Sequence, residues 1–293
     1  MASSASPTVR RRRLAAELRR LRGDRKAAAV ASALGWSIAK ISRYELGRTG
    51  YPLDEVAKLL EFYKVPEPRR SRLIALAEDA NQRGWWEDYD DTISREYREY
   101  VGLEAEAESV VGWNPTYIPG LLQTEEYARE LHVFYQSVVP LPPSAIDRRV
   151  RFRMIRQKIL TERNPQLEMS MVLDESALLR QIGGPEVMRV QLRHLTDVME
   201  MPNIRLQILP LASGSSPPPA PFQVFGFSAE DETTKLGDVV STEGLRDTLW
   251  VEGETDTYIY RLLFQKLTEV SLSPEESRRL ILRAADRHWP GVG

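Results

Sequence analysis

The chain has 293 residues, a length that suggests two domains, each large enough to bury a core. It contains no cysteine, which excludes a disulfide framework and a thiolate metal site. The start of the chain has no apolar segment of the kind found in a signal peptide, and no run of about 18 apolar residues follows, so we expect a soluble cytoplasmic protein.

The net charge of −2 hides a strong asymmetry along the chain. Residues 1–80 carry 17 Lys and Arg against 9 Asp and Glu, a net of +8, while the remainder carries 23 against 33, a net of −10. This distribution indicates that only the amino-terminal part approaches a polyanion.

The first residues, 1–8, are small and polar and are expected to form a disordered tail. Four arginines, Arg10 to Arg13, then lead into a helix whose buried stripe is Leu14, Leu18 and Leu21. These arginines either contact a phosphate backbone or form a solvated helix end. The motif that follows favours the phosphate contact.

Residues Val30 to Arg48 have the pattern of two short helices joined by a tight turn. Val30 and Leu34 are spaced as one inner face, and Ile41 and Tyr44 as another. Gly35 suits a left-handed helix end, and Ser37 stands at an N-cap position. This combination is a helix-turn-helix pattern.

The outward face of the second helix is polar and cationic, which suits insertion into a major groove. The alternative to DNA binding is a helix hairpin whose outward face only contacts solvent. The candidate DNA-contacting residues are Ser37, Ile38, Ala39, Lys40, Ser42 and Arg43, with Arg48, Lys26, Arg12 and Arg13.

Two more helices, about Leu53 to Tyr63 and Arg69 to Asn81, complete a predicted DNA-binding domain over residues 9–82. Residues 83–107 are aromatic and acidic and include Trp85 and Trp86. Paired tryptophans beside acids can cage a ligand, but they more often pack a junction, so we expect a packed connecting segment.

Residues 108–290 mix strands and helices without strict alternation, which predicts an α+β domain with a mostly antiparallel sheet. The expected strands are 108–113, 167–173, 204–209, 222–227, 235–242 and 248–252. The expected helices follow Thr124, Asp174, Gly184 and Ser273 or cover 146–162 and 258–270.

The 146–162 helix is rich in arginine, from Arg148 to Arg156. These side chains form either an anion site or a solvated, salt-bridged face, and the acidic surroundings favour the second. A ligand or partner pocket is expected at Trp113, Tyr117 and the loop from Ser213 to Pro221.

Enzyme activity is not expected. The three histidines, His132, His194 and His288, lie far apart without metal-ligand spacing, and no nucleophile, P-loop or dinucleotide motif occurs. We therefore expect neither a cofactor nor a metal.

The helix-turn-helix residues resemble the xenobiotic-response-element (XRE) family of phage-repressor-like DNA-binding domains. The matching residues are Val30, Ala31, Leu34, Gly35, Ser37, Ile41, Ser42, Glu45, Gly47 and Arg48. The resemblance implies a five-helix domain whose third helix enters the groove. The chain departs from that family at Lys26-Ala27 and Ile38, where members commonly carry glutamine.

The remainder resembles the carboxy-terminal domain of actinomycete regulators of the WhiJ-like group. The matching segments are Gly112 to Ala128, the tryptophan pair, the arginine-rich helix and the final LSPEESRRLI. The resemblance implies a transcriptional regulator whose carboxy-terminal domain senses a small molecule or a small protein partner in an antitoxin-like arrangement.

Two hypotheses remain open. In the first, the protein is a transcriptional regulator that acts as a homodimer and binds double-stranded DNA at two half-sites about 34 Å apart. In the second, it is chiefly an interaction protein that binds a small partner through residues 108–290.

Overall fold

The computed structural model describes residues 7–47, 50–82, 84–89, 91–136, 138–227, 237–244 and 248–290. Most of the predicted tail, residues 1–6, lies outside this range, and Pro7 and Thr8 already belong to the first helix. The described chain divides into two compact units. One holds the residues up to 89 together with 97–106, and the other holds 91–96, 107–226 and the residues from 237 onward.

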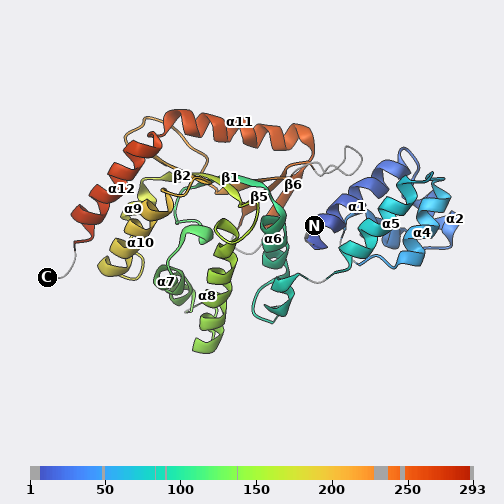
Figure 1. Ribbon diagram of the computed structural model, residues 1–293, viewed down its shortest axis with the longest axis horizontal. Coiled ribbons are helices and arrows are strands. Elements are labelled where there is room, and N and C mark those ends of the chain that lie inside the picture. Colours follow the sequence, from blue (N-terminus) through green and yellow to red (C-terminus); the bar gives the residue numbers. More distant parts are fainter. Residues whose placement is uncertain are drawn as a thin grey trace. The chain divides into compact units, whose positions relative to one another are not determined.

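The amino-terminal unit begins with a small helical bundle, shown in blue to cyan in Figure 1. Its helices are α1 (Pro7–Arg22), α2 (Ala27–Leu34), α3 (Ile38–Glu45), α4 (Leu53–Phe62) and α5 (Arg69–Ala80). Leu14 and Leu18 of α1 are buried against residues of the other four helices, as the stripe predicts. The core is therefore built from apolar residues at helical spacing.

The segment between the bundle and the sheet is also ordered. A short 3-10 helix, η1 (Trp85–Tyr89), is followed by α6 (Arg95–Glu106). Trp86 is buried while Trp85 is partly exposed, and the two rings meet edge to face with centroids 5.9 Å apart. With one ring buried and the two rings in contact, the pair does not form an open cage.

The carboxy-terminal unit is organised by a six-stranded mixed sheet with the order β3-β2-β1-β4-β5-β6. Its strands are β1 (Ser109–Asn114), β2 (Glu168–Asp174), β3 (Ile204–Leu209), β4 (Phe222–Gly226), β5 (Val239–Glu243) and β6 (Thr248–Glu252). The pairs β1–β2 and β2–β3 are parallel, and the pairs β1–β4, β4–β5 and β5–β6 are antiparallel. The start of the predicted strand 235–242 lies outside the described residues.

Helices cover both faces of the sheet, with α11 on one side and α7, α8 and α10 on the other (Figure 1). The carboxy-terminal unit holds η2 (Gly120–Leu122), α7 (Glu125–Tyr135), α8 (Pro143–Gln157), η3 (Lys158–Leu160), α9 (Ser176–Leu179), α10 (Pro185–Val198), α11 (Glu254–Val270) and α12 (Pro274–His288). Trp113, Phe222 and Leu267 belong to the core under α11.

Helix starts in this unit follow local side-chain chemistry. The Thr124 hydroxyl accepts a hydrogen bond from the Tyr127 amide, and Ser273 forms a capping box with Glu276. Asp174 accepts from the Ser176 amide at 2.9 Å. The Thr124 and Ser273 caps were expected from the sequence. Asp174 stands one residue before the N-cap position of α9, which is Glu175 and forms no side-chain cap bond. No helix in the described part of the chain has both the length and the apolar character that a membrane span requires.

Candidate nucleic-acid interface

The turn between α2 and α3 has the geometry that its sequence predicts. Gly35 adopts φ 68° and ψ 30°, the left-handed conformation that a residue without a Cβ accepts at low cost. The amide of Trp36 then donates to the carbonyl of Ala31 at 2.8 Å, which satisfies a free carbonyl at the end of α2. The Ser37 hydroxyl accepts from the Lys40 amide at 3.2 Å and caps α3.

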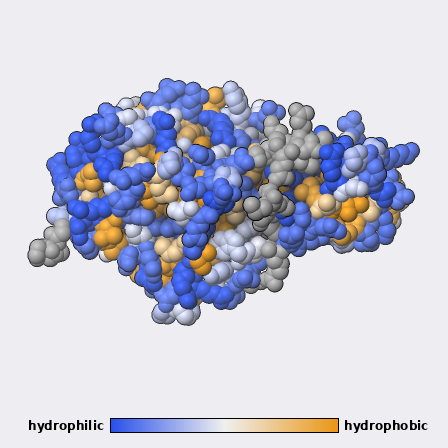
Figure 2. All heavy atoms as spheres, viewed as in Figure 1, coloured by the Kyte–Doolittle hydropathy of each residue, from blue (hydrophilic) through white to orange (hydrophobic). Residues whose placement is uncertain are grey.

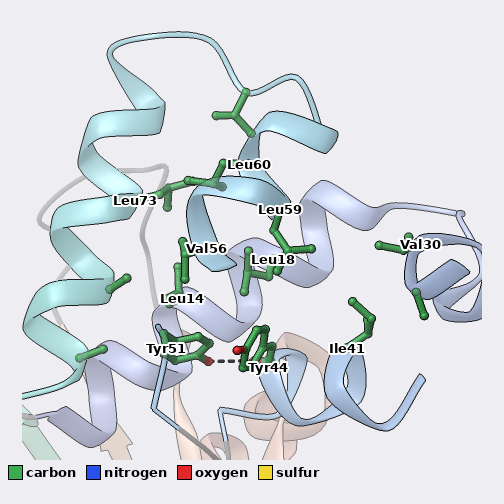
Figure 3. Packing of buried hydrophobic residues seen from close by; sticks show 14 residues of the cluster. Leu14, Leu18, Val30, Ile41, Tyr44, Tyr51, Val56, Leu59, Leu60 and Leu73 are labelled. Atoms are coloured by element: carbon green, nitrogen blue, oxygen red, sulfur yellow. Dashed lines mark hydrogen bonds between the residues drawn. The ribbon is translucent and has the colours of Figure 1, made fainter. Parts of the chain in front are cut away.

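The inner face of α3 is fixed by Ile41 and Tyr44, both buried (Figure 3). The hydroxyl of Tyr51, which is completely buried, donates to the Tyr44 carbonyl at 2.8 Å, the dashed line in Figure 3. Because this bond and the apolar contacts hold the inner face, the orientation of the outer face is fixed as well.

The outer face of α3 is accessible. Ser37, Ala39, Ser42 and Arg43 are exposed, and Ile38 is 56% exposed, which is unusual for a large aliphatic side chain. Arg43 makes no hydrogen bond or ion pair with any residue that the structure describes. A free guanidinium beside two hydroxyls and an aliphatic group supplies donors for phosphate or guanine and a contact for a thymine methyl.

Lys40 behaves differently from Arg43. Its Nζ lies 2.6 Å from Oε1 of Glu55 on α4 and 4.2 Å from the centroid of the Trp36 ring. The Tyr44 hydroxyl donates to the same carboxylate. Desolvation acts to raise the pKa of Glu55, but the hydrogen bonds from Lys40 and Tyr44 outweigh it and lower the pKa. Lys40 is therefore held by an internal counter-ion.

Sequence analysis missed two parts of this arrangement. Nothing in the local pattern of α3 indicates Glu55, which lies fifteen residues after Lys40. The cation–π contact had a signal, since Trp36 and Lys40 are four residues apart around the start of a helix. Glu45, the last residue of α3, is buried and accepts from Arg22 Nε at 2.7 Å.

The arginine run at the start of α1 is mostly structural. Arg11 Nε donates to the Ala80 carbonyl at 2.9 Å, so it stabilises the carboxyl end of α5. Arg12 is paired with Glu99 of α6, and its side chain is only 10% exposed. Desolvation lowers the pKa of Arg12 despite that partner.

Arg13 is buried as well. A guanidinium must be exposed to contact a phosphate backbone, and neither Arg12 nor Arg13 is. The expectation that these two residues hold phosphates is corrected by this burial, and we leave them out of the interface. Lys26, just before α2, is exposed, whereas Arg48 lies outside the described residues.

The pocket expected in the carboxy-terminal unit is also corrected. Trp113 has no exposed surface, and its indole N–H donates to the Pro218 carbonyl at 2.8 Å. The predicted contact with the Ser213 to Pro221 loop exists, but the ring belongs to the core because it points from β1 toward α11. Tyr117 is partly exposed.

Two helices joined by a glycine turn, with the second exposing donors and a free cation, define a helix-turn-helix protein, the class whose second helix contacts duplex DNA. Residues 13–73 match the family described as a helix-turn-helix domain. Residues 97–283 match the domain of unknown function DUF5753, and because this match covers most of the chain, the protein belongs to that family. Neither a curated protein nor a solved structure matches the chain.

Proposed function

We propose that the protein is a sequence-specific DNA-binding transcriptional regulator that inserts α3 into the major groove. The observation that carries this proposal is the outer face of α3, where Ser42 and the unpaired Arg43 are exposed while Ile41 and Tyr44 anchor the helix from inside. A rigid helix that presents polar groups in fixed positions suits base contacts better than a flexible loop does.

The residues shared with XRE-type domains and with the WhiJ-like group support the finer parts of this proposal. They indicate a homodimer that binds two half-sites about 34 Å apart, and a carboxy-terminal domain that senses a small molecule or a small protein partner. Such an effector changes DNA affinity only by as much as its own affinity differs between two states of the protein. We propose no catalytic activity.

The operator is found by selecting duplexes from a random pool with the full-length protein, and affinity is then measured by fluorescence anisotropy. Arg43→Gln removes the free cation on α3, and Lys64→Gln removes an exposed cation elsewhere in the same bundle. We expect Arg43→Gln to weaken operator binding about 10- to 100-fold, because a base contact is worth ~1–3 kcal/mol. Lys64→Gln should change it little.

The salt dependence separates the two kinds of contact. If Arg43 neutralises one phosphate, its loss reduces the slope of log affinity against log salt by ~0.9, for every duplex tested. If it contacts a base, the selected sequence loses its preference at one position. Failure to enrich any duplex, or an equal effect of Arg43→Gln and Lys64→Gln, overturns the proposal.

A further inference from the structure

The arginines of α8 divide into two groups. Arg148 is paired with Asp91 at 2.6 Å, as a salt-bridged face predicts. Arg149 and Arg153 lie one turn apart on one side of the helix, and neither forms an ion pair with a carboxylate of the described residues. The expectation of a solvated, salt-bridged face therefore holds for Arg148 but not for these two.

Arg153 is held in place by neutral groups. Its Nη1 donates to Oε1 of Gln123 at 2.6 Å, and its Nε is buried without a hydrogen-bond partner among the described residues. Gln123 is itself only 4% exposed, and its amide nitrogen donates to the Ile118 carbonyl at 2.6 Å. Gln157 completes the frame by donating to the Gln123 carbonyl at 2.7 Å. The guanidinium is thus positioned without being neutralised.

Further positive charge surrounds Arg153. Arg149 Nε donates to the Thr92 carbonyl at 3.0 Å, again a neutral partner. At Gly120, the position of a Cβ would lie 2.6 Å from Arg156 Nη2 and 3.7 Å from Arg153 Nε, so two guanidinium groups meet beside this glycine. Burial, together with the charges of Arg153 and Arg149, lowers the pKa of His132 on α7 to about 4.

Among the described acidic residues, Glu243 at the end of β5 is attracted by Arg156 and Arg153. Desolvation raises the pKa of this carboxyl, and the attraction of Arg156 and Arg153 only partly opposes that effect. Glu243 forms no ion pair with Arg153 within the described chain. On α8 itself, Asp147 is already paired with Arg129 of α7. Arg149 and Arg153 therefore have no carboxylate partner among the residues that the structure describes.

We infer that Arg149 and Arg153, with Gln123 fixing the second guanidinium, form a binding site for a small anion: the phosphate or carboxylate group of a ligand. A half-buried guanidinium without a counter-ion is costly, and an anion that offers two oxygens to its fork offsets that cost. The partial burial of Arg149 and Arg153 favours a small group over an extended polyanion. The site shares no residue with the outer face of α3.

The test titrates the intact protein with inorganic phosphate and, separately, with acetate, at constant ionic strength set by chloride. Thermal unfolding reports binding, since a ligand that binds only the native state stabilises it by RT ln(1 + [L]/Kd). The NMR resonances of His132 show where the anion binds, because an anion beside Arg153 raises the pKa of this imidazole. The two titrations distinguish a phosphate from a carboxylate as the preferred group.

Arg153→Gln is compared with Arg151→Gln, which removes the same charge from an exposed position on the other side of α8. We expect saturable stabilisation in the wild type and in Arg151→Gln, and at least tenfold weaker binding in Arg153→Gln. Arg153→Lys keeps the charge but loses the planar fork, so its anion affinity should be intermediate. This variant distinguishes a loss of binding from a loss of folding. Arg43→Gln should retain binding, which excludes the helix-turn-helix unit as the source of the signal.

Stabilisation that is the same in Arg153→Gln and Arg151→Gln overturns the inference, as does the absence of saturation with both anions. A phosphate effect that leaves the His132 resonances unchanged also overturns it, because binding then occurs elsewhere. Operator affinity in Arg153→Gln should equal that of the wild type, and this outcome keeps the inference separate from the proposed DNA binding.

Discussion

Nζ of Lys40 on α3 lies 2.6 Å from Oε1 of Glu55 on α4. One of the two cationic side chains on the outer face of α3 is therefore bound to a carboxylate of the same bundle. Arg43, three residues later, has no such partner among the described residues. Lys40 must exchange Glu55 for phosphate before it adds to DNA affinity, whereas Arg43 is available at once. The two cations are therefore not equivalent.

Replacing Glu55 with Gln should increase DNA affinity. The change frees Lys40 and removes a negative charge near the outer face of α3, so the slope of log affinity against log salt should steepen by ~0.9 if Lys40 then neutralises one phosphate. Asp54→Asn is the matched control, because Asp54 is more exposed and pairs with Lys58 at 3.6 Å. An equal gain in both variants would show that only the general charge matters.

Gly35→Ala should destabilise the helix-turn-helix unit by about 1 kcal/mol. The cost arises from the backbone alone, because φ is +68° and no atom lies within 4 Å of the position that a Cβ would take. Asn tolerates the left-handed region better than Ala, so Gly35→Asn should lose less. Denaturant unfolding of both variants measures the difference, and a larger loss in the Asn variant would contradict this explanation.

Tyr51→Phe should cost about 1–2 kcal/mol of unfolding free energy. The hydroxyl oxygen lies 2.8 Å from the Tyr44 carbonyl oxygen and 3.1 Å from the Arg11 carbonyl oxygen, so its single proton is shared between two acceptors. Its removal from a completely buried ring leaves these acceptors with fewer partners. Tyr63→Phe removes a hydroxyl from a partly exposed ring of the same bundle and should change stability by less than about 0.5 kcal/mol. Equal losses would show that the Tyr51 bonds contribute nothing specific.

His132 should make the protein less stable as the pH falls from about 6.5 toward 4. The pKa is about 4 in the folded chain, below the ordinary value of 6.5, so in this window the unfolded state binds more protons. Stability from the neutral imidazole is complete above the unfolded value and declines as the pH drops. We expect a loss of up to about 2 kcal/mol, after allowing for solvent screening of a half-buried group.

The measurement compares urea unfolding of the wild type and His132→Gln between pH 4 and 7. The difference between their unfolding free energies isolates this imidazole from the carboxylates that titrate in the same range. A difference that does not change with pH would show that the His132 pKa is not lowered on folding.

Local chemistry explains which parts of the fold the sequence predicts. The bounds of β3 and β6 match the expected strands, because apolar residues recur at alternate positions in each: Ile204, Leu206 and Ile208 in β3, and Leu249 and Val251 in β6. Helix α11 begins at Glu254, four residues before the expected start at Tyr258, since Glu254 and Asp256 in its first turn favour helix initiation. The order of the strands, with β4 beside β1, depends on contacts between distant residues and has no local signal.

The same distinction applies to the candidate site. Ser37, Gly35 and the inner face of α3 follow from residue type and spacing, and the structure confirms them. The partners of Arg12 and Lys40 cannot be predicted in this way, because only tertiary packing brings Glu99 and Glu55 to them. The aromatic ring of Trp113 suggests a pocket residue. Whether this ring is buried depends on which face of the sheet α11 covers, and that follows only from tertiary packing.

The pairing of Arg12 with Glu99 also decides where the protein is best divided. Residues 97–106 fall inside the DUF5753 match, yet they form one compact unit with the helical bundle. A fragment that stops at residue 82 removes Glu99 and strands a guanidinium whose side chain is 10% exposed in the intact unit. A fragment extended to Glu106 keeps that counter-ion, so the autonomous DNA-binding piece is longer than the helix-turn-helix match alone indicates.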